Sequence, residues 1–291
     1  MRLLLFSSLL VSSLTAAEPL PLSKEYWKDE AFLKSFNGSY RINARIEPSV
    51  STGERGLLVS VQPLMAAGKR KDALQKLTSS SLIRTSAAVA FNAGNIQFEL
   101  GELKSAISYY ERALNIFPTF RRAHRNLGFA YARNDEWEKV MPALESAIKL
   151  GDQDGATYGQ LAYGRMQKEQ YASALQAYRL AQLTQPESID WKAGIAQCLQ
   201  HLRRNEEALA LIEEVIKARP NEISYYLLQA SIHISVNQSD NAMANLELVR
   251  RMGELNAENH LWLAHLHLSS GSSKLARPVM MKALAWRRRP R

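Results

Sequence analysis

The sequence predicts an all-α fold class, a stack of helix-turn-helix units, and three observations predict it. Small residues, large apolar residues and prolines each recur at one constant spacing from Ala87 onward, the spacing that separates Ala106 from Val140. A period of about 34 residues accommodates two antiparallel helices and their turns. The chain of 291 residues is 46% hydrophobic and 22% charged, so it can bury the core that such a stack requires.

Small residues occupy two positions of the period. The first position holds Ala106, Val140, Ala174, Ala208, Ala242 and Ala276. The second position holds Gly94, Gly128, Ala162, Ala196, Ala230 and Ala264. Two helices approach closely only where one of the facing side chains is small. We therefore expect both positions to be contacts between antiparallel helices.

Large apolar residues and prolines complete the pattern. The large position is predicted to fill the space between helices, and it holds Tyr110, Leu144, Tyr178, Ile212, Leu246 and Met280. A further small position holds Ala113, Ala147, Ala181, Val215, Val249 and Ala283. Proline cannot continue a helix, so Pro118, Pro186 and Pro220 are predicted to follow the second helix of their units.

A helix-turn-helix unit of this length with these positions resembles the tetratricopeptide repeat. The resemblance covers six uninterrupted units over residues 87–288, and it implies a right-handed superhelical solenoid. Single units depart from the pattern. His124 and Lys192 stand where a bulky aromatic is expected, and Asp152 and Glu254 stand where a proline would be. These departures weaken single units and leave the family resemblance intact.

Two segments precede the six units. Residues 18–55 mix Pro, Ser and Gly with isolated aromatics, which predicts an irregular segment with one short helix from about Lys24 to Phe36. Residues 56–86 predict a degenerate unit with Pro63 inside its first helix. Such an atypical end repeat would cap the array and protect its outer apolar face.

The start of the chain, MRLLLFSSLLVSSLTAA at residues 1–17, has the layout of a secretory signal peptide. An Arg at position 2 precedes an apolar run from Leu3 to Leu14, and small residues follow it. The alternative is a buried or anchoring helix, but the run is shorter than the ~20 residues that cross a bilayer. We expect cleavage after Ala17, no transmembrane segment afterwards, and an exported protein located in the periplasm.

The formal net charge of +9 is concentrated in two patches. Arg121, Arg122 and Arg125 form one patch, and residues 285–291, AWRRRPR, end the last helix with a basic tail. Charge runs usually face solvent, and docking to an acidic surface is the alternative. Since exported proteins seldom meet nucleic acid, we expect no nucleic-acid partner.

The chemically active side chains form no catalytic or metal-binding pattern. No two of the six histidines have the spacing of three or four residues that places a pair on one helix face. Gly68 and Lys69 lack the remainder of a phosphate-binding loop and are predicted to join two helices. The one cysteine, Cys198, excludes an internal disulfide and is predicted to be a small buried filler. We therefore expect no catalytic residue, no cofactor and no metal.

In tetratricopeptide arrays the first helix of each unit lines a concave groove, and the resemblance implies that a partner protein or peptide lies there. The predicted groove residues are Phe91, Asn95, Phe98, Arg122, Arg125, Phe129, Arg133, Tyr163, Met166, Gln197 and His201. Arginines among aromatics suit an acidic or carboxylate-ended peptide, because a guanidinium binds a carboxylate through two parallel hydrogen bonds. We expect Arg122 and Arg125 to be exposed. The alternative is that some aromatics belong to the core and the arginines only solubilise the groove.

The combination of a signal peptide, FLKSFNGSY and RIEPSV before the array, and GDQDGATYGQLAYG and DWKAGIAQCL within it resembles exported bacterial tetratricopeptide proteins associated with TonB-type systems. The resemblance implies a non-catalytic interaction scaffold at the cell envelope, acting as an accessory of a TonB-type transport system. The alternative is a structural or assembly factor for envelope polymers or outer-membrane machinery. An enzyme would need a converging polar cluster.

Overall fold

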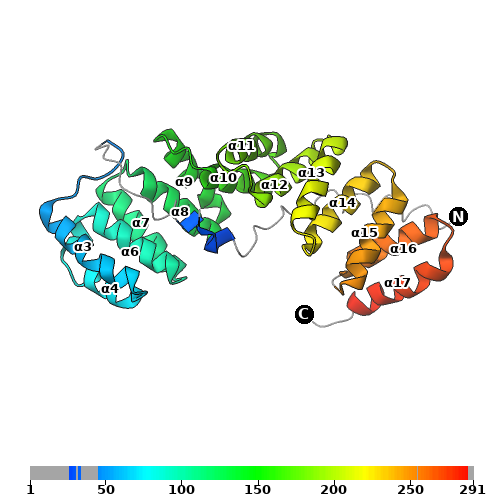
Figure 1. Cartoon of the computed structure of the whole chain (residues 1–291), viewed down its shortest axis with the longest axis horizontal. Coiled ribbons are helices and arrows are strands. Elements are labelled where there is room, and N and C mark those ends of the chain that lie inside the picture. The colour runs from blue at the N-terminus through cyan, green and yellow to red at the C-terminus, as the bar shows by residue number, and fades with distance from the viewer. Residues whose placement is uncertain (1–25, 31, 34–44, 254, 288–291) are drawn as a thin grey trace. The chain divides into compact units, whose positions relative to one another are not determined.

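The computed structural model describes residues 26–30, 32, 33, 45–253 and 255–287, which fall into two compact units (Figure 1). The N-terminal unit extends to Pro186, and the C-terminal unit begins at Glu187. The predicted signal peptide lies outside the described residues, as do residues 288–291 of the predicted basic tail and residues 24, 25, 31 and 34–36 of the helix predicted from Lys24 to Phe36.

All elements of the described residues are helical. The N-terminal unit contains η1 (Tyr26–Lys28), α3 (Thr52–Ala66), α4 (Arg70–Thr78), α5 (Leu82–Thr85), α6 (Ala87–Glu99), α7 (Leu103–Ile116), α8 (Arg121–Arg133), α9 (Trp137–Lys149), α10 (Gly155–Gln167) and α11 (Tyr171–Thr184). The C-terminal unit contains α12 (Ile189–His201), α13 (Asn205–Ala218), α14 (Ile223–Ser235), α15 (Ser239–Arg251), α16 (Ala257–Ser269) and α17 (Ser273–Arg287). The all-α fold class is confirmed.

From α6 onward the helices form pairs with a constant repeat. The first helices begin at Ala87, Arg121, Gly155, Ile189, Ile223 and Ala257. The second helices begin at Leu103, Trp137, Tyr171, Asn205, Ser239 and Ser273. Within each set, every start follows the one before it by the same number of positions, which is the period found in the sequence. The predicted stack of helix-turn-helix units is therefore confirmed.

The small positions of the repeat lie where helices contact one another. Five residues of the first small position are fully buried, and the sixth, Ala276, is 1% exposed. A Cβ atom added to Gly94 would lie 2.6 Å from Cε1 of Tyr110, so the close approach of α6 and α7 requires glycine. Tyr110 is buried, as predicted. Met280 is 38% exposed, so its predicted burial is wrong, and no described helix follows α17 to cover it.

The turn inside each pair uses one residue in the left-handed backbone region. This residue has φ between 57° and 81° in every pair, and it is Gly101, Asp135, Glu169, Arg203, Asn237 or Gly271. A left-handed conformation suits glycine and costs other residues free energy. Asp135 and Asn237 tolerate this region better than most residues, so the turns at Glu169 and Arg203 are the two formed against the local preference of their residue, and the packing of the helices sets them.

Side chains cap the first helices at another recurring position. Ser86, Asp154, Ser188 and Asn256 each accept a hydrogen bond from a backbone N–H of the first turn. These bonds satisfy donors that have no partner within the helix. The equivalent residue before α8, Phe120, makes no such bond and is fully buried. The start of α8 therefore lacks a side-chain cap of its own.

The helices α3, α4 and α5 cover the first pair. Their buried residues Val61, Ala73 and Leu77 pack in one cluster with Val89 and Ile96 of α6. Helix α3 begins at Thr52, a few residues before the predicted start of this capping unit, because Ser51 and Glu54 form a capping box. Gly68 has φ 71° and joins α3 to α4, as predicted for a turn between helices.

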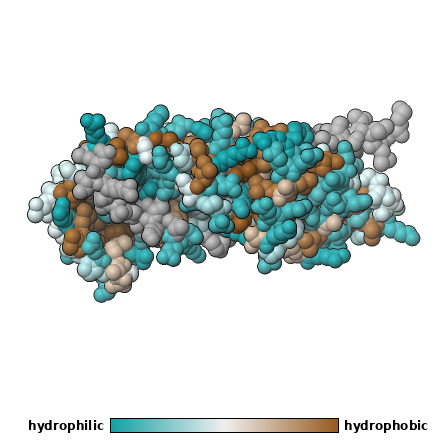
Figure 2. Space-filling view, turned by 45° about the horizontal axis from the view of Figure 1, so that its top comes forward, coloured by the Kyte–Doolittle hydropathy of each residue, from teal (hydrophilic) through white to brown (hydrophobic). Residues whose placement is uncertain are grey.

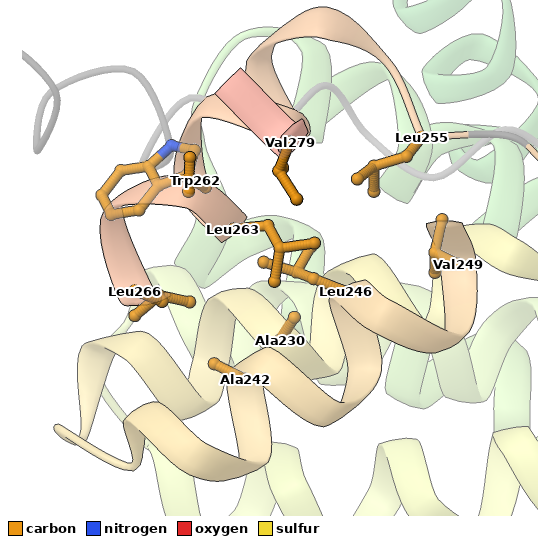
Figure 3. Close-up of a cluster of buried hydrophobic side chains, with 10 residues drawn as sticks. Ala230, Ala242, Leu246, Val249, Leu255, Trp262, Leu263, Leu266 and Val279 are labelled. Atoms are coloured by element: carbon orange, nitrogen blue, oxygen red, sulfur yellow. The ribbon is translucent and has the colours of Figure 1, made fainter. Parts of the chain in front are cut away.

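The last two pairs share a core in which α14 to α17 all take part. Leu246 and Val249 of α15 pack with Trp262 and Leu263 of α16 and with Val279 of α17 (Figure 3). The space-filling view shows apolar patches on a largely hydrophilic surface (Figure 2). These buried side chains form a hydrophobic core within the C-terminal unit. Other large apolar side chains remain exposed at the surface.

Candidate functional site

Most predicted groove residues lie on α6, α8 and α10, and part of the chain that precedes α3 lies against α8. We call this part the N-terminal segment, which the structure describes at residues 26–30, 32, 33 and 45–50. The surface that it contacts is formed by Thr119, Arg121, Arg122 and Phe129, and we call this surface the docking face.

An ion pair between Arg122 and Glu47 lies at the centre of the docking face. Nε of Arg122 donates to Oε2 of Glu47 at 3.0 Å, and the two residues are 6% and 4% exposed. The guanidinium also lies over the rings of Phe91 and Phe120, at 5.3 and 5.9 Å from their centroids. Two aromatic faces and one carboxylate together replace water around a buried cation.

The backbone of the N-terminal segment is bound next to this ion pair. The N–H of Arg121 donates to the carbonyl of Ile46 at 3.0 Å. The hydroxyl of Thr119 donates to the carbonyl of Arg45 at 2.7 Å. Because Phe120 supplies no cap, the carbonyl of Ile46 satisfies a donor at the exposed start of α8. The docking face therefore binds both the backbone and the carboxylate of one short stretch, residues 45–47.

A second contact of the N-terminal segment is aromatic. The rings of Phe32 and Phe129 lie 5.7 Å apart, and Tyr26 lies 5.1 Å from Phe32. Phe32 is 2% exposed and Phe129 is fully buried. Aromatic pairs at this separation bury much apolar surface and prefer tilted geometry. The segment thus contacts the docking face through one aromatic and one acidic side chain.

Arg125 has acidic partners within the array itself. Its guanidinium lies 3.9 Å from Asp152 and 3.6 Å from Asp154. Asp152, which stands where the repeat pattern has a proline, accepts a hydrogen bond from the N–H of Asp154. The departure from the pattern at Asp152 therefore supplies a buried partner for Arg125.

A hydrogen-bonded group of polar side chains lies between α6, α7 and α8. Oδ1 of Asn95 accepts from the hydroxyl of Tyr110 at 2.9 Å and from the amide of Asn126 at 3.0 Å. All three residues are buried. Burial raises the pKa of Tyr110 well above its usual value, so the hydroxyl remains a donor. Asn95 therefore joins three helices and is engaged within the array.

Two predicted groove aromatics belong to the core, as the alternative interpretation held. Phe91 is 1% exposed and packs against Tyr110 and Phe120. Phe98 is 2% exposed, and the exposed Arg133 lies over its ring at 5.0 Å. Arg133 also donates to the carbonyl of Phe98 at 3.2 Å. Arg133 therefore reaches solvent while its guanidinium covers the edge of the core.

The remaining predicted residues are not gathered on the docking face. Tyr163 is half-buried and lies 4.6 Å from Trp137 of α9, while Met166 is 2% exposed. Gln197 and His201 lie on α12 in the C-terminal unit, Gln197 buried and His201 half-buried. The structure brings together Phe91, Arg122 and Phe129 of the predicted set.

The expected exposure of Arg122 and Arg125 is wrong. Both guanidinium groups are buried because carboxylates of the same chain lie next to them. Reasoning from the sequence missed Glu47 and Phe32, which lie in a segment without periodicity. The one available signal was the presence of an acidic and an aromatic residue in RIEPSV and FLKSF, near an array rich in arginine.

The described residues contain no group of three or more His, Cys, Asp or Glu that could hold a metal ion. Cys198 is buried, as predicted, and burial raises the pKa of its thiol to about 12. A thiol with such a pKa stays protonated and unreactive at neutral pH. Among the described helices, none has the length and apolar character needed to cross a membrane.

The sequence matches two family models, one described as TPR repeat over residues 94–135 and one described as tetratricopeptide repeat over residues 165–232. A Caenorhabditis elegans protein, tetratricopeptide repeat-containing protein trd-1, is 25% identical over 175 residues, which are 60% of this chain and 20% of that protein. Protein CTR9 homolog of Arabidopsis thaliana is 29% identical over 91 residues, 31% of this chain and 8% of that protein. The chain thus spans a fifth or less of these relatives.

Solved structures show the same fold at low identity. A tetratricopeptide repeat protein from Parabacteroides merdae has a TM-score of 0.54 and 18% identity, covering 80% of this chain and 92% of that one. YrrB, described as a TPR protein with an unusual peptide-binding site, has a TM-score of 0.54 and 16% identity, covering 71% and 98%. PilF of Pseudomonas aeruginosa has a TM-score of 0.54 and 16% identity, covering 67% and 89%.

Paired antiparallel helices of constant length, stacked within each unit, define an α-helical repeat protein of the kind that binds other polypeptides. The repeat length, the buried small positions and the two family matches identify the repeat. The chain contains tetratricopeptide repeats.

Proposed function

We propose that this protein is a non-catalytic interaction scaffold whose docking face binds an acidic peptide that carries an aromatic residue. The repeat fold supports a protein-interaction scaffold. The observation that carries the choice of peptide is the buried pair of Arg122 and Glu47, in which the chain binds one of its own acidic residues. The docking face has this specificity because an unpaired buried guanidinium is unfavourable, so any occupant must supply a carboxylate.

Backbone recognition supports a peptide rather than a small acidic molecule. Thr119 and Arg121 donate to two consecutive carbonyls, those of Arg45 and Ile46. Main-chain bonds of this kind give affinity, and side-chain sites beside them give specificity. A partner peptide would replace the N-terminal segment and present an acidic side chain to Arg122. The similar fold of YrrB, which is described as having a peptide-binding site, agrees with this use of the array.

The N-terminal segment would compete with a partner peptide because it is tethered to the array. A short tether gives an effective concentration of about millimolar, so an external peptide of weak affinity would be excluded. The scaffold would then accept only partners that bind more tightly than its own segment.

A binding experiment on the full chain tests this proposal. The probe is a labelled synthetic peptide of residues 43–50, NARIEPSV, which presents the acidic residue without the aromatic one, and the readout is fluorescence anisotropy. Glu47→Gln should bind the probe at least about tenfold more tightly than the wild type, since the internal competitor loses its charge. Glu47→Gln combined with Arg122→Gln should lose that gain. Arg179→Gln, at an exposed arginine on α11, is the matched control.

Two outcomes would count against the proposal. Equal binding of the probe by the wild type and by Glu47→Gln would show that the segment does not compete. Equal binding by Glu47→Gln with and without Arg122→Gln would show that Arg122 does not select the carboxylate.

We further propose that the protein is exported to the periplasm and acts as an accessory of a TonB-type transport system. The proposal rests on the Arg and apolar run within residues 1–17 and on the resemblance described above. Mass spectrometry of protein from the periplasmic fraction should find an N-terminus at Glu18, and an intact Met1 in the cytoplasm would contradict export. Crosslinked partners from envelope extracts should include energy-transducing components. Recovery of outer-membrane assembly or cell-wall components in their place would favour the structural alternative.

A further inference from the structure

The last helix, α17, exposes large apolar side chains along one slanting row of its surface. Leu275, Met281 and Leu284 are 56%, 60% and 47% exposed, and Pro278 lies between them. Residues three apart on a helix are neighbours on its surface, so these four side chains form a continuous apolar stripe that slants across the exposed side of α17, from Leu275 at one edge to Leu284 at the other. The remaining side of α17 packs into the array through Val279 and Ala283, so the stripe is additional to the core.

The repeat itself shows that two members of this stripe, Leu275 and Met281, are peculiar to α17. At the position of Leu275 the five preceding second helices carry only polar residues, Ser105, Lys139, Ser173, Glu207 and Asn241. At the position of Met281 they carry only charged residues, Glu111, Glu145, Arg179, Glu213 and Glu247. Two positions that are polar in every other pair are therefore apolar in the last one. The absence of a following described helix explains why a core position such as Met280 is exposed. It does not explain why Leu275 and Met281 replace polar residues.

The charges around the stripe all have one sign. Lys274, Arg277 and Lys282 are exposed, and none of them forms an ion pair with another described residue. The sequence contains no Asp or Glu from Asn259 to its last residue, and after Ala285 it continues as WRRRPR. An amphipathic helix with apolar side chains between unpaired cations matches an interface that is both apolar and anionic.

We infer that α17 docks the protein onto the surface of an anionic lipid membrane. Met281 would enter the boundary between headgroups and acyl chains, and Leu275 and Leu284 would lie against it from the two edges of the exposed side. Lys274, Arg277 and Lys282 would bind lipid phosphates, because long cationic side chains extend along apolar surface to reach polar groups. A second copy of this chain is a poorer occupant, since it would place the same cations against one another. The inference concerns a different helix from the docking face and does not depend on the proposed function.

Vesicle binding by the full chain tests the inference. The probes are vesicles of phosphatidylcholine alone and vesicles with about one third phosphatidylglycerol, and the readout is co-sedimentation. The wild type should bind the anionic vesicles and leave the neutral ones unbound. Each cation near such a surface contributes roughly a fivefold increase in partitioning. Raising the salt concentration should therefore weaken binding by at least about tenfold.

The variant Leu275→Ser/Met281→Glu places in α17 the residues that other pairs carry at these positions, so the fold should tolerate it. It should reduce binding to anionic vesicles by about 100-fold, because it removes two apolar side chains and adds a like charge to the vesicle. Leu180→Ser/Leu183→Glu makes the same changes at exposed leucines of α11 and is the matched control, expected to bind as the wild type does. Circular dichroism should report unchanged helicity for both.

Four results would overturn the inference. They are absence of wild-type binding to anionic vesicles, equal binding to neutral vesicles, unchanged binding by the α17 variant, and equal loss in the α11 control. Binding of a polyglutamate peptide without vesicle binding would identify an acidic protein as the occupant of this surface. A dimer in sedimentation velocity that the α17 variant abolishes, again without vesicle binding, would identify a second copy.

Discussion

The first and the last helix pairs have the same interior and different surfaces. In both pairs the small repeat positions are buried, with Ala106 fully buried and Ala276 1% exposed. Around the first pair, α3 to α5 cover the outer face, and the neighbouring α8 binds the N-terminal segment through Arg122. The last pair has no described helix beyond it and exposes the stripe on α17. The comparison teaches that the repeat positions determine the fold, while the residues between them distinguish one pair from another.

The largest loss of stability is expected when a large residue replaces one of the buried small residues of the repeat. Ala174 is fully buried at the contact of α10 and α11, and Ala174→Trp should lower the free energy of unfolding by more than about 3 kcal/mol, because the helices cannot separate locally. Chemical denaturation followed by circular dichroism measures the loss. Ala172→Trp, at an exposed position of the same helix, is the control and should change stability little. Similar behaviour of the two variants would contradict the register.

The next largest effect is expected where charges are buried inside the array. Arg125→Glu would place a third carboxylate beside Asp152 and Asp154, so the free energy of unfolding should fall by about 3 kcal/mol. Exposed Arg179→Glu should cost little. Thermal unfolding of the two variants makes the comparison, and an unchanged transition for Arg125→Glu would mean that these charges are screened by water.

A smaller effect of opposite sign is expected at α10. Gln160 is fully buried, and among the described residues neither its amide nitrogen nor its oxygen has a hydrogen-bond partner. Gln160→Met has a similar volume and removes the unsatisfied groups, so it should raise the free energy of unfolding by about 1 to 2 kcal/mol. Differential scanning calorimetry would detect the rise. A lower unfolding temperature would indicate that the amide contributes to stability.

The smallest effects on stability are expected in the turns, where substitutions of two residues at the same repeat position should have opposite signs. Gly101 and Arg203 are equivalent, with φ of 81° and 62°. Gly101→Ala should cost about 1 kcal/mol, whereas Arg203→Gly should stabilise by roughly 0.5 kcal/mol, because only the glycine is relaxed in the left-handed region. Denaturant midpoints resolve both changes. Destabilisation by Arg203→Gly would imply that the arginine side chain contributes more than its backbone strain costs.

The fold was predictable because a single constraint recurs in every pair. Each buried small residue, such as Ala174 or Ala196, reports the same contact between two helices, so six weak signals add up to one strong one. The turns recur at the same spacing, and Asp135 and Asn237 are of residue types that tolerate the left-handed region, but nothing in the chemistry of Glu169 and Arg203 marks them as left-handed. Their conformation follows from the packing of the helices around them.

The candidate site was only partly predictable. The arginines of α8 were identified, as was their preference for a carboxylate, since both follow from residue type. Their burial was not predicted, because Glu47 lies 75 residues before Arg122 in a segment without periodicity. Nothing in the composition of that segment indicates which surface it contacts. Phe91 and Phe98 were assigned to the groove because a helical position alone does not distinguish a core aromatic from a surface one.

The N–H group of Arg121 gives the most direct test of the account. It donates to the carbonyl of Ile46 only if the N-terminal segment occupies the docking face. Amide hydrogen exchange, measured by NMR, should be slow for Arg121 in the wild type and at least about tenfold faster in Glu47→Gln, with the amides inside α8 unchanged. Fast exchange of the Arg121 amide in the wild type, or the same rate in both proteins, would contradict the claim that this scaffold binds its own segment.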